Sequence, residues 1–162
     1  MQRKSVSRIL MVAILIMIAS FVLAGGPAVA QSDTAHSGDR HCSDRTLSGD
    51  YGFAVEGLLL PAPGVSIPGR GVTMTHFDGE GNFTQVDSLI IGGTPVSDWS
   101  PVTGTYHVNA NCTGTMNLLP SGGGFVNLRF VVVRRGKEIH TVVWPPFDGP
   151  ARTITSVGIR VE

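Results

Sequence analysis

The sequence predicts an all-β fold, a single antiparallel up-and-down barrel of about eight strands, with a β-sandwich as the alternative and a signal-peptide helix ahead of it. Short runs rich in β-branched and aromatic residues recur at near-regular intervals, and clusters of Gly, Pro, Asn and Asp separate them. After residue 30, no window keeps apolar residues at the i, i+3, i+4, i+7 spacing of an amphipathic helix. Because tight turns join most of the runs, we expect an antiparallel meander.

The first 30 residues have the layout of a secretory signal peptide. Three basic residues among the first eight precede an uncharged apolar run at residues 9–23, and residues 28–30 (Ala-Val-Ala) form a small-residue cleavage site. The apolar run is shorter than the roughly 20 residues of a membrane-spanning helix. We therefore expect a secreted or periplasmic protein that keeps no membrane anchor after cleavage.

The remaining chain is expected to form one domain. Removal of residues 1–30 from the 162-residue chain leaves 132 residues, which suits a single hydrophobic core. Residues 31–46 are polar and without periodicity, so they are predicted to be a flexible N-terminal segment. Residues 47–162 then form the barrel domain.

The charge of the predicted mature chain argues against nucleic acid and anionic membranes as partners. Loss of the three basic residues of the leader leaves nine basic and twelve acidic residues, a balance of −3. Both partners attract clustered positive charge. The one basic cluster, at residues 134–137, is predicted to be the solvated tip of a hairpin.

Three strands are predicted in the first half of the domain. In residues 49–57, Tyr, Phe and Val alternate with small or charged residues. Residues 71–77 also have two alternating faces, but their composition does not show which of the two is buried. The Asp-Gly-Glu-Gly turn at residues 78–81 leads into a strand at 82–91, the firmest hairpin signal in the chain. The apolar stretch 58–64, which contains two prolines, is expected to be an unpaired loop that could cover a barrel mouth.

Five further strands are predicted in the second half, separated by turns that contain Asn, Gly and Pro. Residues 145–150 contain three prolines and are expected to form a stiff loop. The five strands are residues 102–108, 112–119, 125–134, 138–144 and 153–161.

Two of the predicted strands begin with the same short pattern, a hydroxyl residue, Gly, any residue and Tyr. It places Gly49 before Tyr51 and Gly104 before Tyr106. A glycine inside a strand allows a close approach of the backbone or a kink. We expect both glycines to serve this purpose and both tyrosines to be buried.

Edge protection and cysteine placement favour the barrel over the sandwich. Closure of strand 153–161 onto strand 49–57 would remove both unpaired edges. Two cysteines in an oxidising compartment predict one disulfide, Cys42 to Cys112, with a reactive thiol or a metal ligand as the alternative. An immunoglobulin-type bridge joins facing strands, whereas Cys42 precedes the first strand. The bridge is therefore expected to pin the N-terminal segment to the barrel.

The motifs Leu-Ser-Gly-Asp-Tyr-Gly-Phe at 47–53, Phe-Asp-Gly-Glu-Gly-Asn-Phe at 77–83 and Gly-Thr-Tyr-x-Val-Asn-x-Asn-Cys-Thr-Gly-Thr at 104–115, with Cys42 ahead of them, are similar to those of a known group. The chain resembles small secreted, mostly uncharacterised bacterial proteins with calycin-like barrels related to the allene oxide cyclase barrel. The resemblance covers residues 42–145 and implies the fold. Allene oxide cyclases isomerise an unstable epoxide in an apolar barrel with a glutamate and bound water, but no catalytic set of that family aligns with this chain.

Inward-facing aromatic and apolar residues with scattered polar groups would make a ligand site in such a barrel. We therefore expect an exported protein that binds a small apolar or amphipathic ligand, and no cofactor. The candidate ligand-binding residues are Tyr51, Phe53, Met74, His76, Tyr106, Arg129 and Trp144.

The sequence contains no catalytic motif, which leaves enzymatic activity open and favours a non-enzymatic protein. Glu56 and His76 are weak candidates for acid–base groups of a cyclase or isomerase, and Glu56 can act so only if it faces the barrel interior. A structural or adhesive surface module with a filled core is the third possibility. His76, His107 and His140 lie on three strands without the close spacing of metal ligands, so no metal site is predicted.

Overall fold

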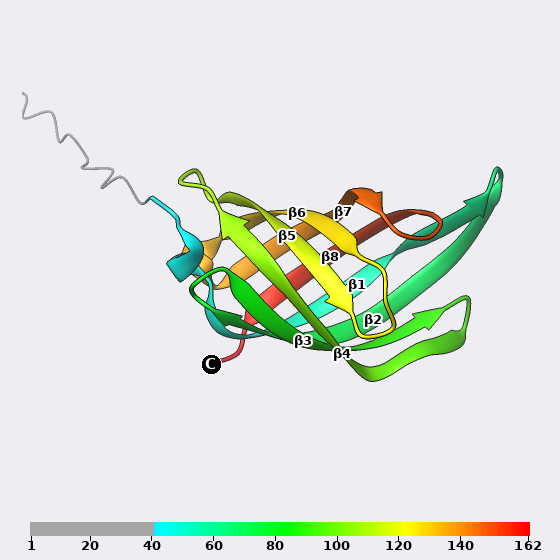
Figure 1. Ribbon diagram of the computed structural model, residues 1–162, viewed down its shortest axis with the longest axis horizontal. Coiled ribbons are helices and arrows are strands. Elements are labelled where there is room, and N and C mark those ends of the chain that lie inside the picture. Colours follow the sequence, from blue (N-terminus) through cyan, green and yellow to red (C-terminus); the bar gives the residue numbers. More distant parts are fainter. Residues whose placement is uncertain (1–40) are drawn as a thin grey trace, which may run out of the picture. The chain divides into compact units, whose positions relative to one another are not determined.

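The computed structural model describes residues 41–162 and confirms the all-β prediction. Eight antiparallel strands, β1 to β8, follow one another in sequence order, and β8 pairs with β1 to close the barrel. The closing ladder runs from Tyr51 opposite Arg160 to Leu60 opposite Ala151. The wall therefore has no open edge along the barrel, and the β-sandwich alternative is wrong (Figure 1). The predicted signal peptide lies outside the described residues.

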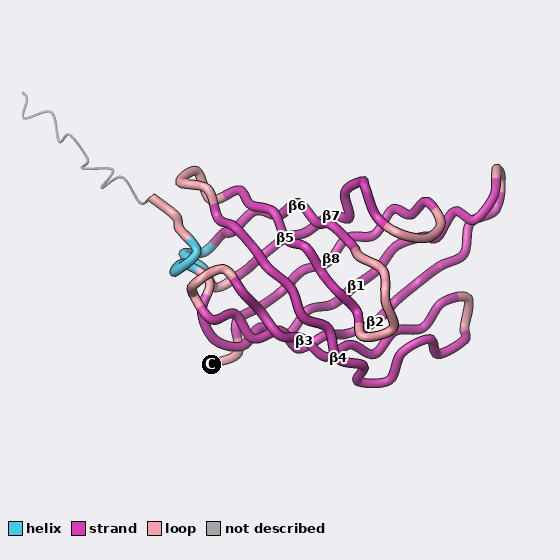
Figure 2. The backbone as a smooth tube through the Cα atoms, viewed as in Figure 1, coloured by secondary structure: helices cyan, strands magenta, loops and turns pink. Residues whose placement is uncertain are grey.

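Several strands are longer than the sequence predicted, and short turns join them (Figure 2). Two short 3-10 turns, η1 at Asp44–Thr46 and η2 at Arg134–Gly136, complete the secondary structure of the described residues. The strands are β1 (Ser48–Ala62), β2 (Val65–Asp78), β3 (Asn82–Ile91), β4 (Thr94–Val108), β5 (Thr113–Pro120), β6 (Val126–Val133), β7 (Glu138–Phe147) and β8 (Ala151–Arg160).

The predicted loop at residues 58–64 is mostly strand. β1 runs on to Ala62 and pairs with the start of β2, so that only two residues, Pro63 and Gly64, form the turn. The hairpin extends beyond the barrel at the end opposite η1, as Figure 1 shows. Proline is tolerated in such a strand where its missing N–H is not needed for the ladder. The covering loop expected at this position is therefore replaced by a hairpin arm.

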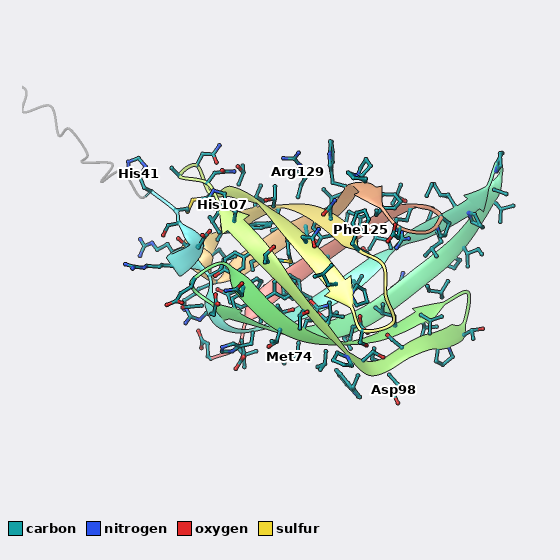
Figure 3. All side chains as sticks on the ribbon, viewed as in Figure 1. His41, Met74, Asp98, His107, Phe125 and Arg129 are labelled. Carbon is teal, nitrogen blue, oxygen red and sulfur yellow. A yellow bond between two sulfur atoms is a disulfide. The ribbon has the colours of Figure 1, made fainter. Side chains whose placement is uncertain are left out.

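Alternation along the strands separates an inner from an outer face, and side chains project from both (Figure 3). The inner side chains at one end of the barrel form the hydrophobic core. Aromatic rings meet there edge to face: the ring centroid of Phe77 lies 5.3 Å from that of Tyr51 and 5.0 Å from that of Tyr106. The buried core comprises Leu47, Tyr51, Phe53, Phe77, Phe83, Tyr106, Val108, Met116, Phe130, Val132 and Ile139.

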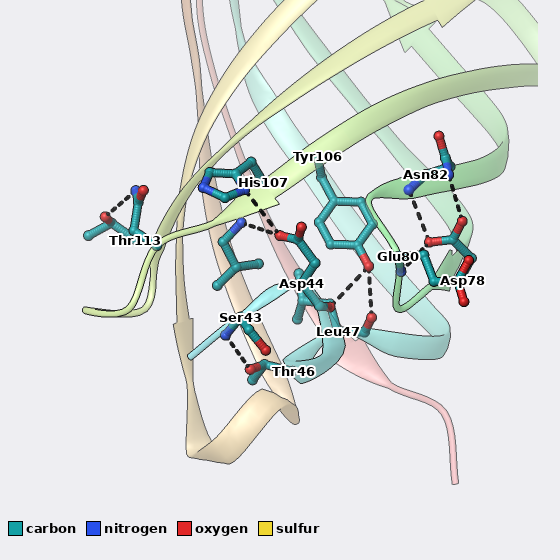
Figure 4. A network of polar contacts seen from close by, with 12 residues as sticks. Ser43, Asp44, Thr46, Leu47, Asp78, Glu80, Asn82, Tyr106, His107 and Thr113 are labelled. Atoms are coloured by element: carbon teal, nitrogen blue, oxygen red, sulfur yellow. Dashed lines mark hydrogen bonds and ion pairs between the residues drawn. The ribbon is translucent and has the colours of Figure 1, made fainter. Parts of the chain in front are cut away.

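The N-terminal turn η1 covers this filled end of the barrel. The hydroxyl of Tyr106 shares its one proton between the backbone carbonyls of Asp44 (3.1 Å) and Leu47 (3.0 Å). The Asp44 carboxylate accepts a bond of 2.6 Å from the backbone amide of Val108 (Figure 4). These contacts tie η1 to β4, so the end of the barrel that carries η1 is closed. We refer to it as the closed end.

The predicted disulfide is present and holds the same segment. Cys42 and Cys112 are bonded, with their Cα atoms 5.0 Å apart. The Cys42 amide also donates a 3.1 Å hydrogen bond to the carbonyl of Ala110 in the β4–β5 turn. The bridge therefore pins the N-terminal segment to the barrel, as its position before the first strand indicated.

Candidate functional site

The half of the barrel away from the closed end holds a cavity of about 440 Å³. All eight strands contribute inward side chains to it, and the β5–β6 turn contributes Ser121 and Gly122. We call the cavity with its lining residues the cup. Its main lining residues are Phe53, Val55, Thr73, Gln85, Asp87, Leu89, Val96, Ser97, Ser100, Pro101, Val102, Met116, Leu118, Pro120, Val126, Leu128, Thr141, Val143, Arg152, Ile154 and Ser156.

Two core residues, Phe53 and Met116, belong both to the packed core and to the cup, and form its floor. The ring of Phe53 lies against Gly158 on β8, where an added Cβ would come within 2.3 Å of it. The missing side chain at Gly158 is thus what lets the ring lie flat against the wall. Aromatic side chains fill the barrel between Phe53 and the closed end, whereas the interior on the other side of Phe53 is open.

Most polar groups of the cup have partners within the wall. The hydroxyls of Thr141 and Ser156 are hydrogen-bonded at 2.6 Å across β7 and β8. The hydroxyl of Ser97 accepts a 3.0 Å bond from the Leu89 amide. The side-chain carbonyl of Gln85 accepts a 2.8 Å bond from the hydroxyl of a buried threonine on β2. These pairs place polar groups in an apolar wall at low energetic cost.

Asp87 is the exception. Its Oδ1 atom is buried and has no hydrogen-bond partner among residues 41–162. Asp87 lies on β3 opposite Thr73 of β2 and Ser100 of β4. The sequence prediction missed this residue. A sequence signal for it was present, because Asp87 lies on the same face of its strand as Phe83. The other residues of that face are apolar or carry an amide, and an acidic residue among them is unusual.

The one basic residue that lines the cup, Arg152, is held by the β7–β8 loop. Its guanidinium donates hydrogen bonds to the carbonyls of Asp148 and Pro150, the latter at 3.2 Å. It also lies over the ring of Phe147, 4.9 Å from the ring centroid. Burial lowers the pKa of Arg152 from its usual value. The side chain is thus occupied by its own loop.

Three of the predicted ligand-binding residues point into the barrel, but only Phe53 lines the cup. Tyr51 and Tyr106 lie in the core of the closed end, where each is nearly fully buried. The hydroxyl of Tyr51 donates to the backbone carbonyl of Gly136, and Tyr106 holds η1. Burial raises the pKa of Tyr106 to about 12. Both phenols therefore have structural partners.

The other four predicted ligand-binding residues lie on the outer wall, as the exposure of Met74 and Arg129 in Figure 3 illustrates. On β2 the inner face carries Thr73 and the alternate residues that follow it, which turns Met74 and His76 outward. Arg129 lies 5.4 Å from the ring centroid of an exposed Trp144, also outside. The placement of Met74, His76, Arg129 and Trp144 in an interior pocket is corrected accordingly.

The two candidate acid–base groups also face solvent. The Glu56 side chain is 67% exposed, and its carboxylate lies 3.9 Å from Arg70 on β2. His76 Nδ1 lies 2.7 Å from the carboxylate of Asp50 on the outer wall. The condition attached to Glu56, that it faces the barrel interior, is not met, and His76 lies on the outer wall as well. Chemistry inside the cup cannot use either group.

The three strand histidines do not converge. His76, His107 and His140 each lie beside an acid of their own, Asp50, Asp44 and Glu138 respectively. Within residues 41–162 no group of three His, Cys, Asp or Glu side chains is placed to hold a metal ion. In the same part of the chain, no helix has the length and apolar character needed to cross a membrane.

Neither the protein-family models nor the curated proteins compared with the chain match it. Among solved structures, the chain is similar to a designed protein described as a de novo fluorescence-activating β-barrel. The two share 12% sequence identity, and the similarity covers 73% of this chain and 96% of the designed one, with a TM-score of 0.47.

Proposed function

We propose that the protein is exported and binds one small apolar or amphipathic molecule in the cup. The observation that carries this proposal is the contrast between the two halves of the barrel interior. Side chains fill the closed end, whereas about 440 Å³ remains free in the other half. Cavities of roughly 300–1,000 Å³ are usual for small-molecule sites.

The composition of the cup supports an apolar or amphipathic ligand. Thirteen of the 23 lining residues are apolar, and nine of these are leucine, valine or isoleucine residues from seven strands. Burial of an apolar ligand against such a wall contributes roughly 25 cal/mol per Å² of surface removed from water. A structural module with a filled core would not need this space. The disulfide between Cys42 and Cys112 supports export, because such bonds persist in oxidising compartments.

Binding of an uncharged apolar dye, N-phenyl-1-naphthylamine, tests the proposal with a matched pair of variants. Leu118 lines the cup, while its neighbour Leu119 is 49% exposed on the outer wall. Leu118→Trp fills part of the cavity and should weaken dye binding at least about tenfold, or roughly 1.4 kcal/mol. Leu119→Trp adds the same side chain outside and should leave binding unchanged.

Circular dichroism and urea unfolding establish that both variants keep the fold. Fluorescence titration of the purified mature protein then gives the dye affinity. Equal affinities in the wild-type protein and the Leu118→Trp variant would mean that the dye binds elsewhere. Absence of dye binding to all three proteins would remove the support for an apolar site.

A further inference from the structure

Asp87 is the single acidic residue that lines the cup, and from it we propose the chemical class of the ligand. The ligand carries a protonated amine on an apolar body, and the amine donates a hydrogen bond to Asp87 while the body lies against the apolar part of the wall. This inference rests on the proposed function, since it requires a ligand in the cup. It assigns Asp87 as the polar anchor of that ligand.

Within the described residues, the protein leaves one oxygen of the Asp87 carboxylate without a hydrogen-bond partner. Oδ1 is buried and has no hydrogen bond among residues 41–162, although buried polar atoms in native proteins nearly always have one. The residues opposite it in the wall, Thr73 and Ser100, carry hydroxyl side chains without a charge, so they do not neutralise the carboxylate. A buried charge without a partner is costly, and a cation that pairs with it recovers much of that cost.

The wall does not supply the cation itself. Arg152, the basic residue of the cup, donates to two carbonyls of its own loop and lies over Phe147. It lies near the start of β8 opposite Leu59, whereas Asp87 lies opposite Thr73, which in turn lies opposite Phe53 of the floor. By strand pairing, Asp87 is therefore in line with Phe53 of the floor. Arg152 instead lies near the strand ends, on the side of the cup away from the floor.

The charge of the cup selects among ligand head groups. Asp87 is the single acidic residue among those that line it. A carboxylate ligand would bring a second negative charge beside Asp87, which is unfavourable at low dielectric. A neutral hydroxyl would provide a weaker hydrogen bond than an ammonium group, because charge-assisted hydrogen bonds are roughly twice as strong. An alkylammonium in the cup compensates the negative charge and can donate a charge-assisted hydrogen bond to the Asp87 carboxylate.

Three eight-carbon straight-chain probes test the head group: n-octylamine, octan-1-ol and octanoate. Each is titrated against the protein with bound N-phenyl-1-naphthylamine near pH 7, where an alkylamine is protonated like a lysine side chain. We expect octylamine to displace the dye at roughly a tenth of the octanol concentration or less, and octanoate to be the weakest.

Asp87→Asn is the decisive variant because it keeps the shape and removes the charge. Octylamine should bind it roughly ten- to a hundredfold more weakly, while octanol and the dye bind as before. Asp98→Asn, at an exposed acid on β4, is the matched control and should leave all affinities unchanged. Thermal unfolding shows whether each variant keeps the fold; Asp87→Ser replaces Asp87→Asn if the latter does not.

The outcomes separate this inference from the proposed function. If the dye binds and Leu118→Trp blocks it, but octylamine shows no advantage over octanol or keeps its affinity in Asp87→Asn, the amine assignment is overturned and the binding function stands. If neither the dye nor any probe binds the wild-type protein, both fail together. A loss confined to octylamine in Asp87→Asn supports the assignment.

Discussion

The hydroxyl of Tyr106 donates a 3.0 Å hydrogen bond to the backbone carbonyl of Leu47, joining the middle of the chain to the residue that precedes β1. Leu47 is fully buried, so its carbonyl is shielded from water in the folded state. The Asp44 carbonyl lies 3.1 Å from the same hydroxyl. The one phenolic proton is therefore shared between two carbonyls of the segment that seals the barrel, and its loss would remove their common donor.

Replacement of Tyr106 by Phe should destabilise the closed end without emptying the core. The ring remains against Phe77, but a buried carbonyl loses its donor, which costs roughly 1–3 kcal/mol. Urea unfolding followed by tryptophan fluorescence measures the change in free energy of unfolding. A loss below about 0.5 kcal/mol, the usual range for neutral surface changes, would show that η1 is held without this phenol.

The same tyrosine predicts a loss of stability at high pH. Burial raises the pKa of Tyr106 from 10.0 to about 12, so the folded protein holds the phenolic proton more tightly than the unfolded chain. The resulting stabilisation is fully present below pH 10.0 and is lost as the pH rises through about 12. Burial also raises the pKa of Tyr51, which adds to the effect.

Urea midpoints measured between about pH 8 and pH 12 test this pH dependence. In Tyr106→Phe the decline above pH 10.0 should be shallower than in the wild-type protein, while the contribution of Tyr51 remains. Identical slopes in the two proteins would mean that Tyr106 titrates alike in the folded and unfolded states.

The barrel itself could be predicted from the sequence, because turns and alternation are local signals. The turn at residues 78–81 and the burial of Tyr51 and Tyr106 are confirmed. A Cβ at Gly104 would lie 2.1 Å from the carbonyl of Asn117, whereas Gly49 has a φ of +85° and no such close contact. Closure of β8 onto β1 followed from the need to remove edges.

The inner face of β2 could not be predicted, and this misplaced two of the seven predicted ligand-binding residues, Met74 and His76. Met74 and the valine at 72 are more apolar than the threonines at 73 and 75, yet the threonines face inward. Phe77 decides the matter, since its ring belongs to the aromatic core and period-two alternation then fixes every other residue of the strand. Which large side chain enters the core is a tertiary choice that one strand does not reveal.

Removal of the disulfide should cost much of the protein's stability. Cys42 and Cys112 are 70 residues apart in sequence, and a closed loop of this length is worth about 4 kcal/mol on the chain-entropy estimate. The double variant Cys42→Ser with Cys112→Ser should lower the free energy of unfolding in guanidinium by this amount. A reductant should lower the stability of the wild-type protein similarly and have no effect on the variant.

The floor of the cup should be sensitive to a single methyl group. Gly158→Ala places a Cβ within 2.3 Å of the Phe53 ring, which must then move. We expect destabilisation of about 1–3 kcal/mol, as for other overpacked sites, together with weaker dye binding as the ring shifts into the cup.

Gly52 on the neighbouring strand is the matched control, because an added Cβ there meets no atom within 4 Å. Gly52→Ala should change the stability by less than about 1 kcal/mol and leave dye binding intact. Equal effects of the two substitutions would mean that the contact between Phe53 and Gly158 does not shape the cup.

The β2–β3 turn predicts a dependence of stability on acid. Asp78 accepts a hydrogen bond from the Asn82 side chain (2.8 Å) and others from the backbone amides of Asn82 and Glu80. These bonds, the Asn82 side chain first, hold the pKa of Asp78 below its usual 3.8. Stabilisation from the ionised form is therefore present above pH 3.8 and is lost as the pH falls through the lowered pKa.

Asp78→Ala should lower stability near neutral pH and reduce its decline in acid, because the carboxylate that must be protonated is gone. Glu80 takes part in the same turn through its backbone amide, so Glu80→Gln keeps that bond and serves as the control. Unfolding midpoints between about pH 2 and pH 6 distinguish the two variants. If the unfolding midpoint falls as steeply with decreasing pH in Asp78→Ala as in Glu80→Gln, carboxylates elsewhere in the barrel determine the acid sensitivity.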